Sequence, residues 1–169
     1  MNYLIVVDMQ NDFIDGALGS PEAKAIVPYV KNLIQSFDGQ VLFTRDTHEE
    51  NYLSTQEGRN LPVPHCIRNT NGWQIRAELD ALRITPPIDK PTFGSSALVE
   101  QLSGKEINSV TFVGLCTDIC VISNVMLVKA FFPEVPVFVD ALGCAGVTPE
   151  SHRNALAAMK AVQVTVINE

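Results

Sequence analysis

The sequence has no long apolar run and no cluster of basic residues. A membrane-spanning helix needs about 20 consecutive apolar residues, and no stretch of this chain approaches that length. Twelve basic and nineteen acidic residues give a net charge of −7, which disfavours binding to nucleic acids or anionic membranes. The start of the chain also lacks the basic segment and the apolar length of a signal peptide. We therefore expect neither a nucleic-acid nor a membrane partner.

Three glycine-based motifs are missing as well. No G-x-G-x-x-G follows the first apolar run, and no G-x-x-x-x-G-K-[ST] occurs, so the usual forms of dinucleotide and nucleoside-triphosphate binding are unsupported. The G-x-S-x-G elbow that presents a catalytic serine is absent too.

Cysteines are few and show no disulfide framework. The four stand at positions 66, 116, 120 and 144, which favours a reduced, cytoplasmic protein. With 169 residues, 46% of them hydrophobic, the chain can bury a full core, and residues 1–169 are predicted to form a single domain. The apolar composition also leaves room for a homo-oligomeric interface, which we expect.

Apolar segments alternate between the periods of strands and helices. Strands are predicted at 3–7, 41–44, 110–113, 136–139 and 162–167, and helices at 21–37, 73–82, 97–102, 118–131 and 149–160. Residues 86–91 form an extended segment bracketed by prolines, and residues 47–71 show no period and are predicted to be a long polar loop. This alternation predicts an α/β fold: a doubly wound, mainly parallel sheet with helices on both faces.

Ligands bind at the carboxyl ends of the strands in such sheets. Asp8, Asp46, Asp140 and, after a short turn, Cys120 are predicted to lie at those ends. Thr117 is the expected N-cap of the helix that carries Cys120, which places this thiol in the first helical turn. Unpaired amides and the positive end of the helix dipole can activate a thiol there, although a buried, inert cysteine is the alternative.

Asp8, Lys90 and Cys120 could together form a nucleophilic site. Cys120 would attack a carbonyl carbon, Asp8 would exchange the proton as general acid and base, and Lys90 would favour the charged forms. The backbone amides of Cys116 and Cys120 could form an oxyanion hole.

The polar loop carries a second group of chemistry-bearing residues. Asp46 and His48 lie on one side of an extended chain, with Glu57 and His65 further on, and imidazoles with carboxylates suit zinc, iron or manganese. Cys66 is a weaker candidate ligand. His152 is predicted to be a surface residue.

Three segments resemble the isochorismatase-like cysteine hydrolases, and within them the nicotinamidases. Residues 7–13 (VDMQNDF) look like the family's opening motif with its catalytic aspartate, 90–96 (KPTFGSS) like its lysine segment, and 114–121 (GLCTDICV) like its nucleophile motif. The resemblance implies a cis peptide between Leu115 and Cys116.

By the same resemblance, Asp46, His48, Glu57 and His65 match the ligands of a divalent metal, most simply zinc, which binds the pyridine nitrogen of nicotinamide. Phe13 matches an aromatic residue of the substrate pocket, where we also place Leu61 and Leu115. Many nicotinamidases have a tryptophan just before the Pro-His-Cys segment, whereas this chain reads Asn60-Leu61-Pro62-Val63.

The resemblance therefore predicts a hydrolase of small amides, with nicotinamide as the first candidate substrate. Because the tryptophan is absent, an amidase or carbamoyl hydrolase acting on another small amide is the alternative. A non-catalytic metal-binding or interaction module of the same fold is a third hypothesis.

Overall fold

The computed structural model describes residues 1–169 and contains six strands: β1 (Asn2–Val7), β2 (Gln40–Asp46), β3 (Ile88–Lys90), β4 (Ser109–Leu115), β5 (Val137–Ala145) and β6 (Thr165–Ile167). They form one sheet in the order β3-β2-β1-β4-β5-β6, and every neighbouring pair is parallel. The predicted α/β class with a parallel sheet is thereby confirmed.

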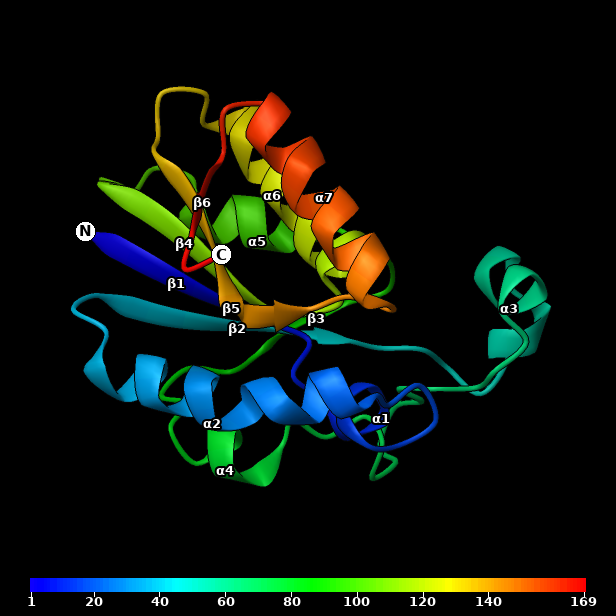
Figure 1. Cartoon of the computed structure of the whole chain (residues 1–169). Helices are drawn as coiled ribbons and strands as arrows, with labels where there is room; N and C mark the ends of the chain where they lie inside the picture. Colours follow the sequence, from blue (N-terminus) through cyan, green and yellow to red (C-terminus); the bar gives the residue numbers. More distant parts are fainter.

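The helices are α1 (Asn11–Ile14), α2 (Pro21–Ser36), α3 (Gln56–Asn60), α4 (Ala77–Asp80), α5 (Ser96–Leu102), α6 (Ile122–Phe131) and α7 (Pro149–Ala161), with a 3₁₀ turn η1 (Tyr52–Ser54) and a π turn η2 (Thr117–Val121). In Figure 1, α1, α2 and α4 cover one face of the sheet, and α5, α6 and α7 cover the other. Helix α3 stands apart from both layers. No helix has the length and hydropathy to span a bilayer.

The central strands are buried on both faces. Residues Tyr3 to Val7 of β1 are each at most 4% exposed, as their unbroken apolar run predicts. Their side chains alternate between two clusters: Ile5 packs with residues of α5, α6 and α7, and Leu4 packs with residues of α2 and α4. The sheet thus separates two apolar cores and holds the ends of β1 and β4 at fixed positions.

The helix predicted at 73–82 is wrong over its first half. Only Ala77–Asp80 are helical, because Ile75 pairs with Gln10 in an isolated antiparallel bridge that keeps the backbone extended. The indole of Trp73 donates to Thr47 Oγ1 over 2.8 Å, and the guanidinium of Arg45 lies 3.5 Å from the centre of its ring. These long-range contacts outweigh the local helical pattern.

The loop predicted at 47–71 contains two short elements that its sequence did not signal, η1 and α3.

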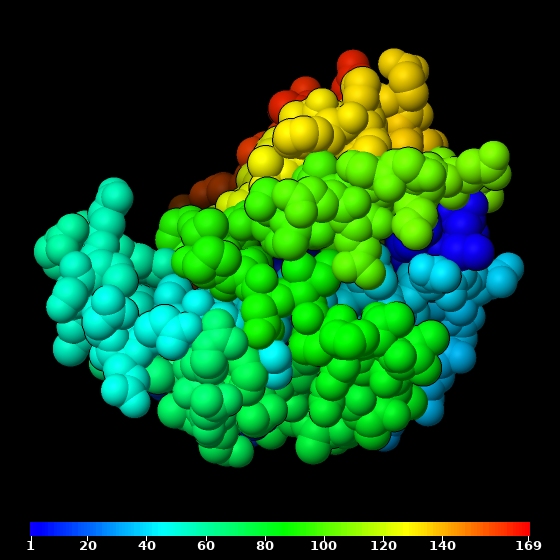
Figure 2. All heavy atoms as spheres, turned by 180° about the vertical axis from the view of Figure 1, so that it is seen from behind, coloured from blue at the N-terminus to red at the C-terminus, as the bar shows by residue number.

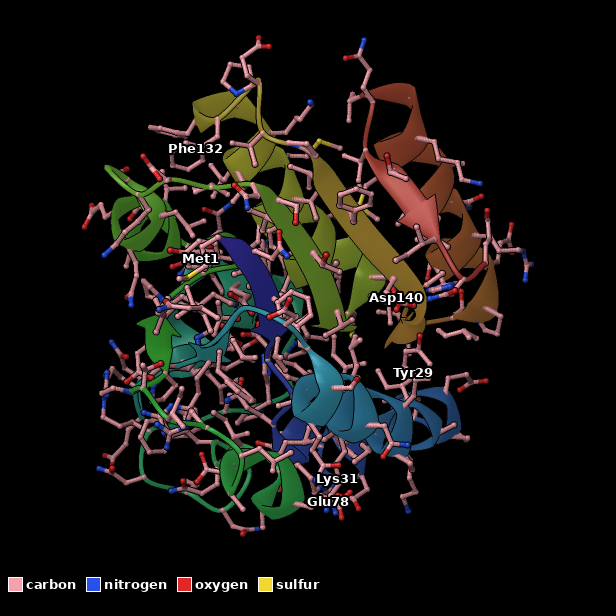
Figure 3. All side chains as sticks on the ribbon, turned by 90° about the vertical axis from the view of Figure 1, so that its left-hand side faces the viewer. Met1, Tyr29, Lys31, Glu78, Phe132 and Asp140 are labelled. Atoms are coloured by element: carbon pink, nitrogen blue, oxygen red, sulfur yellow. The ribbon has the colours of Figure 1, made fainter.

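Strand β5 continues past its predicted end, so Asp140 lies inside a strand. A register shift between Phe112 and Gly114 lets β5 pair with β4 as far as Ala145. Asp140 accepts hydrogen bonds from the Tyr29 hydroxyl at 2.9 Å and from Asn168 at 3.0 Å, which ties α2 and the C-terminal segment to β5. Figure 3 shows Tyr29 and Asp140 at this junction. The prediction that Asp140 lies at the end of a strand is therefore wrong. The last strand is also shorter than predicted, because residues 162–164 form a turn whose N–H groups bond to the carbonyls of Met159 and Lys160 at the end of α7.

Candidate active site

Three side chains from distant parts of the chain meet beyond the carboxyl end of β1. Lys90 Nζ lies 2.6 Å from Asp8 Oδ2 and 3.4 Å from Cys120 Sγ, and it donates to the backbone oxygen of Thr92 over 3.0 Å. All three side chains are almost completely buried. Asp8 follows β1, Lys90 ends β3 and Cys120 lies in η2 after β4. The parallel sheet brings these three ends to one edge, and Asp8, Lys90 and Cys120 form one cluster there.

Asp8 is held by backbone geometry and by one hydroxyl. Its φ of 47° lies in the left-handed region that non-glycine residues seldom adopt, a feature that clusters at functional sites. Thr44 donates its hydroxyl to Asp8 Oδ1 over 2.7 Å. Burial raises the pKa of the Asp8 carboxyl, and the ammonium of Lys90 opposes that rise. A carboxyl with a raised pKa can both accept and return a proton.

The turn that carries Cys120 differs from the expected helix start. Residues Thr117–Val121 form a π turn whose N-cap is Cys116, and Cys116 has no side-chain capping bond. Thr117 is therefore not the N-cap. Its hydroxyl lies 2.8 Å from Nδ1 of His152, which is partly buried and not the surface residue we predicted. The Leu115–Cys116 peptide is cis, as the resemblance implied.

The resting thiol of Cys120 keeps its proton. Burial and the nearby carboxylate of Asp8 raise the pKa of Cys120 well above the usual value, and the ammonium of Lys90 opposes them only in part. Lys90 stays charged: burial disfavours the ammonium, but the negative charges of Asp8 and Asp46 outweigh it and raise its pKa. Activation of this thiol by the turn alone is thus insufficient, and the proton must pass to a base.

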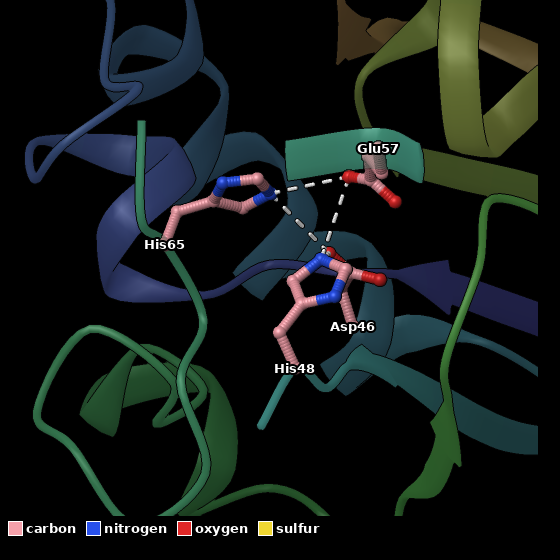
Figure 4. A group of neighbouring side chains, drawn as sticks. All are labelled: Asp46, His48, Glu57 and His65. Atoms are coloured by element: carbon pink, nitrogen blue, oxygen red, sulfur yellow. Dashed lines mark ion pairs between the residues drawn. The ribbon is translucent and has the colours of Figure 1, made fainter. Parts of the chain in front are cut away.

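Asp46, His48, Glu57 and His65 form a second cluster beside the first (Figure 4). One potential ligand atom from each of the four lies within 4.8 Å of all the others. His48 Nε2 is 3.0 Å from Asp46 Oδ2 and 3.5 Å from Glu57 Oε1, and His65 Nε2 is 3.7 Å from both of these oxygens. Asp46 is the last residue of β2, and His48 lies in the loop after it. Glu57 lies in α3, and His65 lies in the loop that follows α3.

The donors of this cluster fit a divalent metal. Nδ1 of His65 lies 2.8 Å from the Val63 carbonyl oxygen, which leaves Nε2 of the ring facing the cluster with its lone pair. Nε2 of His48 is buried and has no hydrogen-bond partner. The carboxylates of Asp46 and Glu57 outweigh burial and raise the pKa of His48 to about 9, so the pocket attracts positive charge. Two imidazoles and two carboxylates are a usual donor set for zinc, iron or manganese.

Asp46 belongs to both clusters. Its Oδ1 is 3.2 Å from Lys90 Nζ, whereas Oδ2 faces His48. Burial favours the neutral carboxyl, but the nearby ring of His48 and the charge of Lys90 outweigh it and lower the pKa of Asp46. The amide side chain of Gln10 fixes the backbone here: it donates to the Asp46 carbonyl over 2.8 Å and accepts from the Asp46 N–H over 2.7 Å. Gln10 lies within the motif at residues 7–13, but its residue type alone predicted no role.

A small cavity connects the two clusters. Its walls include Cys120 and Cys116 on one side, Asp46, Glu57 and His65 on the other, and the apolar side chains of Phe13, Leu18, Leu61, Phe93 and Ile119. Phe13 and Leu61 thus lie where the sequence placed them. Leu115 does not: it is fully buried in the apolar core and does not line this cavity.

Several residues of the site were not predicted from the sequence. Phe93 and Ile119 line the cavity, and their positions inside two of the matched motifs were the only available signal. Asn124 holds the nucleophile turn: its side-chain amide donates to the Cys120 carbonyl over 2.7 Å and accepts from the Ser95 N–H over 3.0 Å. Cys66, the weaker ligand candidate, is buried in the apolar core and lies outside the group of four side chains that could hold a metal.

Comparisons with known proteins agree on one family. A family model described as "Isochorismatase domain" matches residues 2–169. A nicotinamidase of Schizosaccharomyces pombe is 27% identical over 210 residues, covering 98% of this chain and 92% of the relative. The structure of a nicotinamidase/pyrazinamidase from Bacillus subtilis superimposes with a TM-score of 0.85 at 26% identity and covers 98% of both chains. A zinc complex of a pyrazinamidase from Pyrococcus horikoshii gives 0.82 at 28% identity, covering 99% of both chains. This chain belongs to the isochorismatase domain family.

Proposed function

We propose that the chain is a metal-dependent cysteine amidohydrolase that converts nicotinamide to nicotinate and ammonia. The observation that carries the proposal is the position of Lys90, whose ammonium contacts the thiol of Cys120, the carboxylate of Asp8 and the carboxylate of Asp46. This contact puts a nucleophile and a base next to a two-histidine cluster at a shared cavity. Relatives named nicotinamidase, at similar length, support the same activity.

In the first half of the reaction, Asp8 takes the proton of Cys120, and the thiolate attacks the amide carbon to form a C–S bond. Asp8 then returns the proton to the amide nitrogen, the C–N bond breaks, and ammonia leaves a thioester on Cys120. In the second half, Asp8 takes a proton from water, and the hydroxide attacks the thioester carbon. The C–S bond breaks, the acid is released and the thiol recovers its proton.

Two groups compensate the negative charge that develops on the amide oxygen and at the sulfur. The backbone N–H groups of Cys116 and Cys120 would form the oxyanion hole, a contribution of about 3 kcal/mol for each donor. Lys90 would stabilise the thiolate, because its ammonium lies 3.4 Å from Sγ and is shielded from water.

Asp46, His48, Glu57 and His65 would hold the metal, and zinc is the ion that this donor set and the zinc-bound relative favour. When bound, the ion would act as a Lewis acid that can coordinate the ring nitrogen of the substrate. The apolar side chains of Phe13 and Leu61 would pack against the ring, which turns the amide toward Cys120.

Ammonia release from nicotinamide tests the activity, and Cys120→Ala tests the mechanism. We expect the substitution to abolish turnover, and the wild-type enzyme, quenched during turnover, to show the mass of an acyl group on Cys120. Full activity of Cys120→Ala would contradict the mechanism.

A panel of small amides and carbamoyl compounds tests the alternative substrates. A Cys120 that resists thiol reagents at neutral pH would support the third hypothesis, a non-catalytic module.

The surroundings of the enzyme are also part of the proposal. All four cysteines are free, which is consistent with a reducing compartment such as the cytoplasm. We infer a homo-oligomer from the apolar composition, and light scattering of the purified protein would test it.

A further inference from the structure

A second cavity opens directly outside the reaction cavity. It lies between the segment 48–61, which includes α3, and residues 91–93 after β3. Its volume is about 610 Å³, against about 50 Å³ for the reaction cavity. Figure 2 shows the segment around α3 projecting from the body of the molecule, with a hollow between the two. We call this hollow the outer cavity.

The two cavities adjoin each other. Glu57, Leu61, Phe93 and Ile119 line both of them. Leu61 is 38% and Phe93 is 43% exposed, although both are apolar and both line the two cavities. A substrate held beside Cys120 therefore has free space next to it on the side of Leu61 and Phe93.

The walls of the outer cavity offer hydrogen bonds but little charge. Gln56, Asn60 and Thr92 contribute neutral polar groups, and the two amides can each donate and accept. The hydroxyl of Thr55 also lies in the lining but is already bonded to the Tyr52 carbonyl and the Gly58 N–H. The titratable residues there, His48 and Glu57, face the metal cluster. Lysine and arginine are absent from the lining, so an anionic group would find no partner. The chemistry matches a neutral, hydrogen-bonding group.

The position of this wall depends on the metal cluster. Tyr52 is 1% exposed, and its ring centre lies 4.7 Å from that of His48 and 5.1 Å from that of His65. The Tyr52 hydroxyl donates to the Leu61 carbonyl over 2.9 Å, and the Tyr52 carbonyl accepts from the Thr55 hydroxyl over 2.7 Å. Residues on both sides of α3 are thus anchored to the histidine pair, and the outer cavity has a defined wall.

We propose that the outer cavity is a substrate subsite, and that the enzyme accepts aromatic amides whose ring carries a neutral, hydrogen-bonding substituent. This inference rests on the proposed amidase function and extends it, because it names the substrate class beyond nicotinamide. Leu61 and Phe93, which line both cavities, would contact the substituent where it leaves the reaction cavity, and Asn60 and Thr92 would offer it hydrogen bonds.

Three sets of ring isomers test the subsite: hydroxymethyl-, ethyl- and carboxymethyl-nicotinamide, alongside nicotinamide itself. At least one hydroxymethyl isomer should be hydrolysed with a kcat/KM within about tenfold of nicotinamide, and its carboxymethyl counterpart should be at least about 100-fold poorer. The ethyl isomer of the same size should fall between them, because it fills the space without hydrogen bonds.

Tryptophan substitutions localise the effect. Asn60→Trp and, on the opposite wall, Thr92→Trp should lower the ratio of kcat/KM for the hydroxymethyl isomer to that for nicotinamide by at least about tenfold. Leu53→Trp is the matched control, since Leu53 is 53% exposed near α3 and does not line the cavity. Its ratio should equal that of the wild type.

The outcomes separate this inference from the proposed function. Rapid hydrolysis of nicotinamide with no turnover of any substituted isomer would overturn the subsite and leave the proposed function standing. Equal loss of the ratio in Leu53→Trp would also overturn it. Absence of ammonia release from nicotinamide and from every isomer would overturn both.

Discussion

Lys90 donates to a carboxylate oxygen of Asp46 over 3.2 Å, so one ammonium group joins the thiol cluster to the histidine cluster. The other oxygen of Asp46 faces His48. Charge at the candidate metal site and charge at the nucleophile are therefore coupled through two side chains that both lie out of solvent.

The first prediction contrasts Asp46→Asn with Glu57→Gln. Both should weaken zinc binding by at least about tenfold, because each removes a negatively charged candidate ligand. Only Asp46→Asn should also lower the free energy of unfolding of the metal-free protein, by about 3 kcal/mol, because it leaves Lys90 with one carboxylate fewer. Glu57 has no contact with Lys90 and is partly exposed. Competition with a chelating dye and urea denaturation measure the two effects; equal stability of the two metal-free variants would contradict the coupling.

The second prediction concerns the buried ion pair of Lys90 and Asp8. Lys90→Met keeps the unbranched side chain as far as the ε position but leaves the Asp8 carboxylate without its counter-ion, which should cost about 3 to 5 kcal/mol of stability. Adding Asp8→Asn should recover part of this loss, because the uncompensated charge disappears. Urea unfolding of the wild type, both single variants and the double variant gives the coupling energy, expected to be about 2 kcal/mol. Strict additivity would show that the two groups do not interact.

The third prediction concerns Gln10, whose side-chain amide donates to the carbonyls of Asp46 and Trp73 and accepts from the Asp46 N–H. Gln10→Leu should lower the free energy of unfolding by about 3 kcal/mol, because it leaves buried backbone groups unpaired beside a candidate metal ligand. Gln35→Leu on the exposed side of α2 is the control and should change stability by about 0.5 kcal/mol or less. Similar thermal unfolding of the two variants would refute the role of Gln10.

The fourth prediction is a dependence of stability on pH. Burial lowers the pKa of His152 below its usual value, an effect that Arg153 adds to and that Asp118 and Glu169 oppose. The unfolded chain therefore binds a proton more readily than the folded one, so the contribution of His152 is fully present above about pH 6.5 and is lost as the pH falls through the folded-state pKa. Urea unfolding across this range should show a shallower pH dependence for His152→Gln. An unchanged slope would assign the dependence to other groups.

The elements that the sequence predicted best are those whose burial is local and regular. The unbroken apolar run 3–7 predicts a strand buried on both faces, and Ser20 followed by Pro21 predicts the start of α2, where Ser20 Oγ accepts the N–H of Ala23. The failures are segments governed by distant partners. The indole of Trp73 bonds to Thr47 and lies against the guanidinium of Arg45. Asp140 lies inside β5 because a register shift in β4 extends the pairing of β4 with β5.

By itself, the sequence determined the alternation of strands and helices, the candidate residues and their order, because hydrophobic period and motif spacing are local properties of the chain. Only the tertiary structure decided which of these residues meet. Parallel pairing brings Asp8, Lys90 and Cys120 to one edge, and it places Asp46 where one carboxylate serves two clusters. In the same fold, Leu115 is buried in the core and Phe93 lines the cavity. The reason is that strand order and register join residues more than 80 positions apart, and no local period records those distances.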